Sequence, residues 1–285
     1  IILEAATRRA ALQSGDIHVI PSAESTTVKI LQGAKNVKVV STQELAYSLI
    51  GFNLEREPLD DPRVRRAISY ATNREEIIQA VYDGLATVGT PLPPALGEWH
   101  VEPSDLETYE QDYNKAEELL EEAGYPDGIK FSVTVSPTLQ TALKIAQVLQ
   151  QQLKPANINM ELDTVEWGTF LDAWRNSDFD SFASLNGGSF DPDGYFYRTF
   201  HSGGSTNVFN YSDPVMDALL EKGQVTADLE DRQEIYVALQ KRLIEKMPIL
   251  FVAYADLHTV LRENVMDFVQ LSDRSMVMLR RTWIK

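Results

Sequence analysis

Residues 129–185 read IKFSVTVSPTLQTALKIAQVLQQQLKPANINMELDTVEWGTFLDAWRNSDFDSFASL, and they decide the fold because they alternate two kinds of apolar pattern. Short apolar runs at 129–135, 158–165 and 179–185 predict strands, and longer segments at 139–153 and 167–175 repeat apolar residues at helical spacing. A β-α-β-α-β succession of this kind predicts a largely parallel sheet with helices on its faces. We therefore expect an α/β protein.

The segments on either side continue this mixture. Before residue 129 we expect helices at 3–13, 24–32, 63–71, 73–83 and 115–123 and strands at 16–20, 37–40 and 46–53. After residue 185 we expect helices at 214–222 and 229–245 and a buried strand at 249–254. Asp61 before Pro62 is typical of a helix start, because aspartate caps the first turn and proline fits it. Three prolines within 90–97 predict a rigid, extended loop.

The composition limits the possible partners. The chain has 285 residues, which favours two lobes, and its 42 acidic against 26 basic residues give a formal net charge of −16. No cluster of lysine and arginine offsets this charge, so nucleic acid and anionic membrane surfaces are poor partners. The longest apolar run, at 248–255, is far shorter than the roughly 20 residues that span a bilayer.

Catalytic and metal-binding signatures are absent from the sequence. It contains no HExxH, GxSxG, GxxxxGK[ST] or GxGxxG pattern and no cysteine, and its four histidines do not have metal-ligand spacing. We therefore expect no catalytic residue, no metal and no cofactor. Asp191 and Asp193 flank Pro192 and leave two interpretations: the paired carboxylates of a hydrolase, or the turn and helix cap that Asp-Pro-Asp-Gly favours.

The most unusual segment is NGGSFDPDGYFY, residues 186–197, where a strand runs into two glycines, a serine and a group of aromatics. Open α/β sheets bind ligands beyond the carboxyl ends of their strands, and glycine there lets a ligand approach the main chain. The same residues would also form a plain strand-to-helix turn whose aromatics feed the core. From the residues alone, both interpretations stay open.

Several long motifs follow one another along nearly the whole chain: TRRAALQSGDIHVI (7–20), LIGFN (49–53), PLDDPRVRRAISYATNREEIIQAVYDGLA (58–86), PLPP (91–94), YNKAEELLEEAGYPDG (113–128), VEWGTFLDAW (165–174), FDPDGYFYRTF (190–200), VQLSD (269–273) and TWIK (282–285). In these motifs the chain resembles the family 5 extracellular solute-binding proteins of ABC importers, the group of the dipeptide- and oligopeptide-binding proteins. The agreement of many motifs in the family's order makes the resemblance specific.

The resemblance implies a periplasmic-binding-protein-like fold of type II, in which the chain forms three lobes and the ligand lies between the first and the third. Residues 1–53 would be part of lobe I, residues 54–265 the complete lobe III, and residues 266–285 a return segment to lobe I. The second lobe and the start of the first would be absent. We expect residues 1–53 to pack with the tail, apart from the central sheet. The surface left uncovered, around Leu49 to Phe52 and the tail, should drive self-association.

As a function, the resemblance implies the substrate-binding component of an ABC importer. Such a protein captures a peptide or other small solute between two lobes by hinge closure and delivers it to the membrane permease, without catalysis. It is exported and works in the periplasm or at the extracellular face of the cell membrane; its signal peptide is not in this chain. Two alternatives remain: a hydrolase or other enzyme that uses Asp191 and Asp193, and a solute sensor that reports to a signalling partner.

Departures from the family's pattern bear on the ligand. Peptide binders of the family hold the ligand's α-amino group with an aspartate where this chain has Gly188, and they carry a tryptophan where it has Leu185. The dipeptide binder's arginine for the ligand carboxylate falls near Ser136. The resemblance therefore favours a long peptide held through its backbone, or a neutral oligosaccharide-like solute.

We expect the ligand wall to be the loop after the strand at 179–185, with neighbours at the same edge of the sheet. The candidate ligand-binding residues are Asn186, Gly187, Gly188, Ser189, Tyr195, Trp167, Ser136 and Thr138. The two glycines would let a ligand lie against main chain, and Trp167 would stack on a peptide side chain or a sugar face. Asp191 should be structural and cap the helix after it. Gly188→Val should then block the cleft while leaving the melting temperature nearly unchanged.

Overall fold

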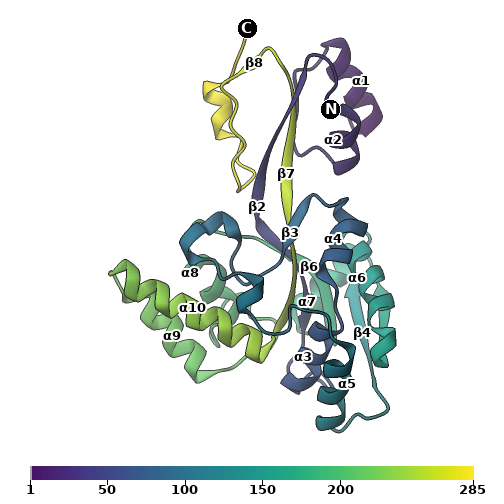
Figure 1. The fold of residues 1–285 in the computed structure, drawn as a ribbon, viewed down its shortest axis with the longest axis vertical. Helices are drawn as coiled ribbons and strands as arrows, with labels where there is room; N and C mark the ends of the chain where they lie inside the picture. The colour runs from purple at the N-terminus through teal and green to yellow at the C-terminus, as the bar shows by residue number, and fades with distance from the viewer. Residues whose placement is uncertain (1) are drawn as a thin grey trace.

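The computed structural model describes residues 2–285, which form two subdomains of unequal size (Figure 1). Two long strands, β2 (Val37–Phe52) and β7 (Ile249–Arg262), run through both subdomains and pair with each other along most of their length. The segments near both chain ends lie in the smaller subdomain. Within residues 2–285, no helix is both long enough and apolar enough to cross a membrane.

One mixed sheet has the strand order β1-β7-β2-β6-β4-β5, and β3 joins it by pairing with β7. Its other strands are β1 (Val19–Ile20), β3 (Ala86–Val88), β4 (Ile129–Val135), β5 (Ile158–Thr164) and β6 (Ser181–Asn186). β4 pairs in parallel with β5 and β6, whereas β1, β2, β3 and β7 pair antiparallel. The α/β prediction is confirmed, but the prediction of a largely parallel sheet is wrong. Apolar periodicity marks a buried strand without giving its direction.

Helices of the larger subdomain pack around this sheet. They are α3 (Pro62–Tyr70), α4 (Arg74–Tyr82), α5 (Tyr113–Glu122), α6 (Gln140–Gln152), α7 (Trp167–Arg175), α8 (Asp193–Phe200), α9 (Pro214–Val225) and α10 (Leu229–Lys246). Since parallel crossovers are right-handed and β5 and β6 lie on opposite sides of β4, α6 and α7 lie on opposite faces. Three short 3-10 helices are η1 (Pro94–Trp99), η2 (Pro103–Asp105) and η3 (Lys154–Ala156). The expected extended loop at 90–97 is thus partly helical.

The helix starts predicted at residues 63 and 73 agree with the structure to within one residue. Asp61 Oδ1 accepts a hydrogen bond from the Arg63 N–H (2.8 Å), with Pro62 in the first turn of α3. Asn73 Oδ1 accepts one from the Glu76 N–H (2.9 Å) at the start of α4. Both helices then bury the apolar stripe that their spacing predicts, made of Val64, Ala67, Ile68, Ala71, Ile77 and Ile78.

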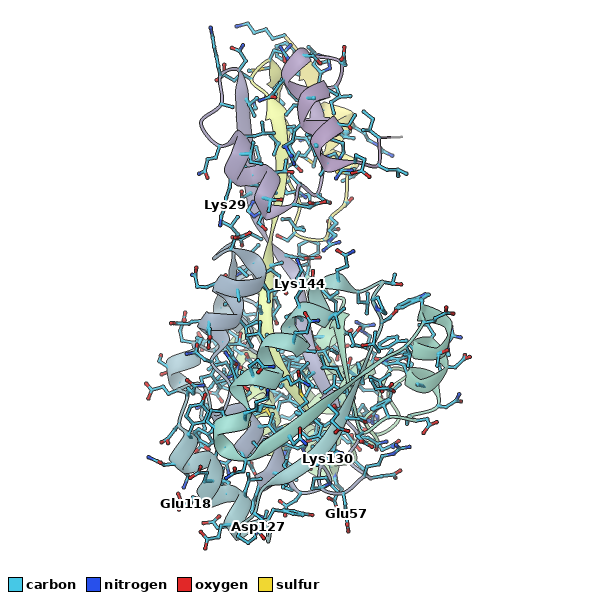
Figure 2. The ribbon with its side chains drawn as sticks, turned by 90° about the vertical axis from the view of Figure 1, so that its right-hand side faces the viewer. Lys29, Glu57, Glu118, Asp127, Lys130 and Lys144 are labelled. Atoms are coloured by element: carbon cyan, nitrogen blue, oxygen red, sulfur yellow. The ribbon has the colours of Figure 1, made fainter. Side chains whose placement is uncertain are left out.

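The smaller subdomain packs α1 (Ala5–Ser14) and α2 (Ser25–Leu31) on the far ends of β2 and β7, around a core made of Leu12, Ile20, Ala23, Val28, Leu31, Val37 and Val260. Its tail adds η4 (Val277–Arg281) and the pair β8 (Val265–Met266) and β9 (Trp283–Ile284). Arg274 in the tail forms a two-pronged ion pair with the buried carboxylate of Glu44 on β2. Lys29, seen near the junction in Figure 2, forms an exposed ion pair with Asp83 of the larger subdomain (2.7 Å).

The boundary between the subdomains lies inside β2, not after it. Residues 47–52 pair with β6, and β1 and the first part of β2 pair with β7 in the same sheet. The prediction that residues 1–53 stay apart from the central sheet is therefore wrong for both strands. On β2, Val37 belongs to the core of the smaller subdomain, and the residues from Leu45 onward belong to the core of the larger one. The strand therefore passes from one subdomain to the other near Gln43. The strands expected at 37–40 and 46–53 are one strand, because the register irregularity after Gln43 interrupts it only locally.

The surface expected to be uncovered is only partly so. Leu49, Ile50 and Phe52 are at most 3% exposed, because this part of β2 is an inner strand of the sheet and its side chains belong to the core of the larger subdomain. The expectation of exposed apolar surface is therefore wrong at 49–52. In the tail, by contrast, Trp283 is 49% exposed and Ile284 is 55% exposed.

Candidate functional site

The candidate site lies at the carboxyl edge of the three parallel strands. Because β4, β5 and β6 run in one direction, the residues that follow them, Ser136, Trp167 and Gly187, arrive at the same edge. The loop after β6 also reaches the junction of the subdomains, where Gly188 lies against Leu45 of β2. A group bound at this edge would therefore lie close to the strands that connect the two subdomains.

A cavity of about 230 Å³ lies between α7, β6, the C-terminal end of α8 and the segment that follows α8. Its lining is mainly aromatic and aliphatic: Leu49, Trp167, Phe170, Leu171, Trp174, Phe182, Leu185 and Phe209, with Ser184, Asn186, Arg198, Thr199 and Thr206 as polar members. Trp167 is 42% exposed, and its ring stacks on Phe170 with a centroid distance of 5.5 Å. An apolar hollow with a few polar groups is the usual character of a ligand pocket.

Asn186 links the end of β6 to its surroundings through its side chain. Its Nδ2 donates to the Tyr47 hydroxyl (2.8 Å), and its Oδ1 accepts from Nη2 of Arg198 (2.8 Å). Burial raises the pKa of Tyr47 above its ordinary value, at which the hydroxyl is already protonated at neutral pH. The amide is thus held in one orientation at the cavity wall.

Arg198 on α8 is a lining residue that the sequence analysis missed. Its Nη2 also donates to the Gly187 carbonyl (2.8 Å) and its Nε to the Gly194 carbonyl (3.3 Å). Nη1 makes no hydrogen bond within residues 2–285, and the guanidinium forms no ion pair with a described carboxylate. The sequence does carry a signal for this residue, because Arg198 is the one charged residue within the aromatic run YFYRTF at 195–200.

Some predicted site residues line hollows and others do not. Trp167 and Asn186 line the 230 Å³ cavity. Gly187 and Gly188 line a second hollow of about 340 Å³, between the loop, β2 and residues 272–274 of the tail. Thr138, which follows β4, is exposed, and Ser189 is half-buried. Neither residue lines either hollow.

Two of the predicted ligand contacts are buried. Tyr195 has no exposed surface, and its hydroxyl donates to the Leu45 carbonyl (2.7 Å). Ser136 also has no exposed surface, so a ligand could not reach either side chain in this structure. The structure thus contradicts direct contact through these two side chains. The Tyr195 side chain packs against β2, and the Ser136 side chain lies inside the turn after β4, where its Oγ accepts a hydrogen bond from the Thr138 N–H (3.4 Å).

The chain is similar in sequence to proteins of one known family. Residues 1–207 match the family described as bacterial extracellular solute-binding proteins, family 5, middle region. The chain belongs to this family. It is 27% identical over 276 residues to the dipeptide-binding protein of Escherichia coli, covering 93% of this chain and 51% of that protein. It is 28% identical over 301 residues to the oligopeptide-binding protein AppA of Bacillus subtilis, covering 100% of this chain and 55% of that protein.

The solved structures show the same relationship. The structure of Bacillus subtilis AppA in complex with a nonapeptide superimposes with a TM-score of 0.83 and 27% identity, covering 100% of this chain and 59% of that one. The chain thus has the periplasmic-binding-protein-like α/β fold and spans about half the length of the curated relatives it matches. These relatives are solute-binding proteins rather than enzymes.

In this family 5 chain, Asp191 is structural, as predicted. Its two oxygens accept hydrogen bonds from Nη2 and Nη1 of Arg232 (2.8 and 3.0 Å), and Oδ1 also accepts from the Asp193 N–H (2.9 Å). The Arg232 guanidinium holds the pKa of the Asp191 carboxyl below its usual range. A general acid needs the opposite shift, so the geometry gives no support to a hydrolase built on this pair.

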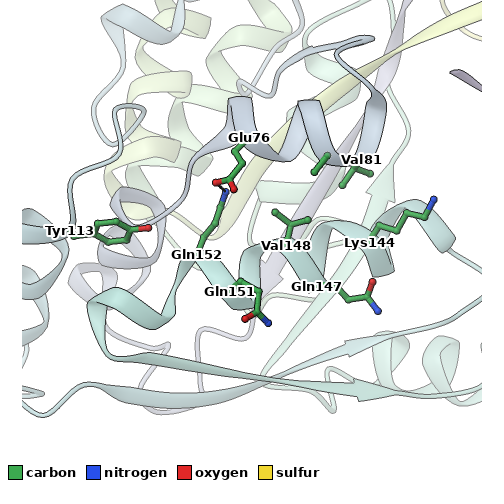
Figure 3. Close-up of a pocket in the computed structure, with 9 residues that line it drawn as sticks. Glu76, Val81, Tyr113, Lys144, Gln147, Val148, Gln151 and Gln152 are labelled. Carbon is green, nitrogen blue, oxygen red and sulfur yellow. Dashed lines mark hydrogen bonds between the residues drawn. The ribbon is translucent and has the colours of Figure 1, made fainter. Parts of the chain in front are cut away.

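A larger hollow lies elsewhere in the chain. A groove of about 560 Å³ runs between α4 and α6, where Glu76 accepts a hydrogen bond from Gln152 (2.8 Å) (Figure 3). It follows the C-terminal half of α6, which returns toward the amino ends of the parallel strands. Ligands of open α/β sheets bind beyond the carboxyl ends of the strands. The aromatic cavity lies at that edge, so it is the better candidate for the ligand site although it is smaller than this groove.

Proposed function

We propose that this chain is the ligand-binding half of the substrate-binding component of an ABC importer. It captures a peptide or other small solute between two lobes and delivers it to the membrane permease, in the periplasm or at the extracellular face of the cell membrane. The observation that carries this proposal is the aromatic cavity at the carboxyl end of β6, beside the two strands that join the subdomains.

The smaller subdomain corresponds to part of lobe I and the larger one to lobe III. With the boundary near Gln43, lobe I takes residues 1 to about 43 and the tail, and lobe III takes the rest. Closure is then a rotation of one lobe against the other, absorbed near the irregularity of β2. The solute fills the space between lobe III and the rest of lobe I.

A peptide is the first candidate for the solute. The Escherichia coli relative is a dipeptide-binding protein, and the Bacillus subtilis structure holds a nonapeptide. The aromatic cavity is smaller than the roughly 300–1,000 Å³ of a complete ligand site, so it suits one side chain, with the facing lobe enclosing the remainder. A neutral oligosaccharide-like solute is the second candidate, because the exposed face of Trp167 would also stack on a sugar ring.

The test is to identify what the full-length protein carries. The protein is purified without denaturation and then denatured, and the released molecules are identified by mass spectrometry. Binding of the identified solute is measured by isothermal calorimetry, and the mixture is analysed for products. Saturable binding of a peptide without turnover is expected. Chemical conversion of the solute would contradict the proposal. It would also be contradicted if the protein carried no solute after purification and bound none that was added.

A further inference from the structure

Arg198 differs from the other arginines that lie inside the larger subdomain. Arg65 and Arg74 are each 3% exposed, and all three of their guanidinium nitrogens donate hydrogen bonds to carbonyl or hydroxyl oxygens. Arg198 uses only Nε and Nη2 in this way, and Nη1 has no partner among residues 2–285. Two N–H groups are therefore left over at a residue that lines the aromatic cavity.

The position of the guanidinium is fixed before any ligand arrives. Gly187, Gly194 and Asn186 each accept a hydrogen bond from it, so its plane and its reach are set by the end of β6, the loop after it and the first turn of α8. These partners are neutral, and the positive charge remains without a carboxylate in a chain whose net charge is −16. A half-buried cation of this kind binds an anion well, because the cost of ordering and partly desolvating it has been met in folding.

We propose that Arg198 binds a carboxylate of the solute through Nη1, and that the group next to this carboxylate is apolar or aromatic. The second part follows from the lining, since Trp167, Phe170, Trp174 and Leu185 surround the remaining space. A peptide's C-terminal residue with an apolar side chain has this chemistry, as does an acidic side chain beside an apolar one. The inference rests on the proposed function and narrows it. Arg198 would take the role of the carboxylate-binding arginine that the resemblance places near Ser136, but not that of the amino-binding aspartate missing at Gly188.

The first experiment uses small probes on the full-length protein. Phenylacetate and phenylacetamide have the same ring and differ only in the carboxylate. Their binding is followed by quenching of tryptophan fluorescence and by calorimetry. Phenylacetate should bind about tenfold more tightly at low salt, and the difference should shrink as salt is added. Equal affinity for the two probes, or no binding of either, would overturn the proposal.

Substitutions test whether Arg198 is responsible for the preference for phenylacetate. Arg198→Gln should abolish the preference for phenylacetate, and Arg198→Lys should retain part of it. Arg175→Gln removes the same charge from α7 at an exposed position outside the cavity lining, and it should keep the full preference. Since Arg198→Gln also removes contacts to the loop, its melting temperature is measured in parallel. An undiminished preference in a folded Arg198→Gln protein would overturn the assignment.

Peptides distinguish the source of the carboxylate and separate this inference from the proposed function. Ala-Ala-Phe is compared with its C-terminal amide and with the amide of Ala-Glu-Phe. Preference for the free acid points to the C-terminus, and preference for the glutamate peptide points to a side chain. Peptides that bind equally well with and without any carboxylate would keep the receptor function and reject the role of Arg198. A probe preference without any peptide binding would support Arg198 and reject a peptide as the solute.

Discussion

Gly188 lies directly against the main-chain carbonyl of Leu45, at the point where the loop after β6 meets β2. A Cβ atom at residue 188 would lie closer than 3.0 Å to that oxygen and also to the hydroxyl of Tyr195. The φ angle of Gly188 is not left-handed, so the glycine is needed for space rather than for backbone conformation. The expectation that Gly188→Val would leave the melting temperature nearly unchanged is therefore at odds with this packing.

Gly188→Ala should instead destabilise the protein. The added methyl group pushes the loop away from β2, and overpacking of this kind costs about 1–3 kcal/mol. Urea unfolding at neutral pH measures the change. Gly187→Ala is the matched control, because its nearest neighbour would be Nη2 of Arg198 at 3.9 Å. Equal stability of the two variants would show that the loop moves freely.

Trp167→Ala should weaken solute binding by about 10- to 100-fold in the full-length protein, because it removes the exposed aromatic wall of the cavity. The free energy of unfolding should change little, since the side chain is 42% exposed. Trp283→Ala removes a similarly exposed indole from the tail and should not affect affinity. Calorimetry with the co-purified solute is the measurement. Equal affinities for both variants would place the solute elsewhere.

Stability should fall in mild acid because of His258, which lies on β7 between the two cores. Its Nδ1 pairs with Ser41 Oγ (2.7 Å), and its Nε2 is buried without a partner among the described residues. Burial lowers the pKa of His258, and nearby Asp256 only partly offsets this effect. The unfolded histidine has a pKa of roughly 6.5 and takes up a proton first. The stabilisation is thus complete above about pH 6.5 and is lost as the pH falls toward the folded pKa.

The free energy of unfolding, measured by urea at intervals between pH 7.5 and 5, should therefore decline in the wild type. His258→Gln cannot titrate and should flatten the decline, whatever its effect on stability at pH 7.5. His18→Gln is the control for the loss of one imidazole in the smaller subdomain. A decline that is equally steep in the wild type and in His258→Gln would contradict this origin.

The isolated chain should self-associate through the smaller subdomain and its tail. Large apolar side chains there are 43–59% exposed: Ile30, Val269, Val277, Leu279, Trp283 and Ile284. Exposed apolar surface of this kind drives association. Light scattering should detect dimers, and a Leu279→Asp, Ile284→Asp double variant should shift them toward monomer. A strictly monomeric wild-type chain at high concentration would rule the association out.

Local features of the fold could be predicted from the sequence. The strand β4 begins and ends at the predicted residues, Ile129 and Val135, and so does the helix α7, from Trp167 to Arg175. The cap at Asp61 follows in the same way. All of these depend on residues close to one another in the chain, where periodicity and capping chemistry are sufficient. The resemblance to family 5, now confirmed, came from the order of such local motifs.

The tertiary structure alone decided how these elements combine into a site. It made β2 a single strand shared by both subdomains, and it set the antiparallel pairing of β2 with β6. It buried Tyr195, whose aromatic ring the sequence assigned to the ligand wall, and brought Arg198 to the cavity instead. Residues 45 and 188 are far apart in the chain, so their contact has no local signature. Each of these outcomes depends on long-range packing, which apolar spacing does not encode.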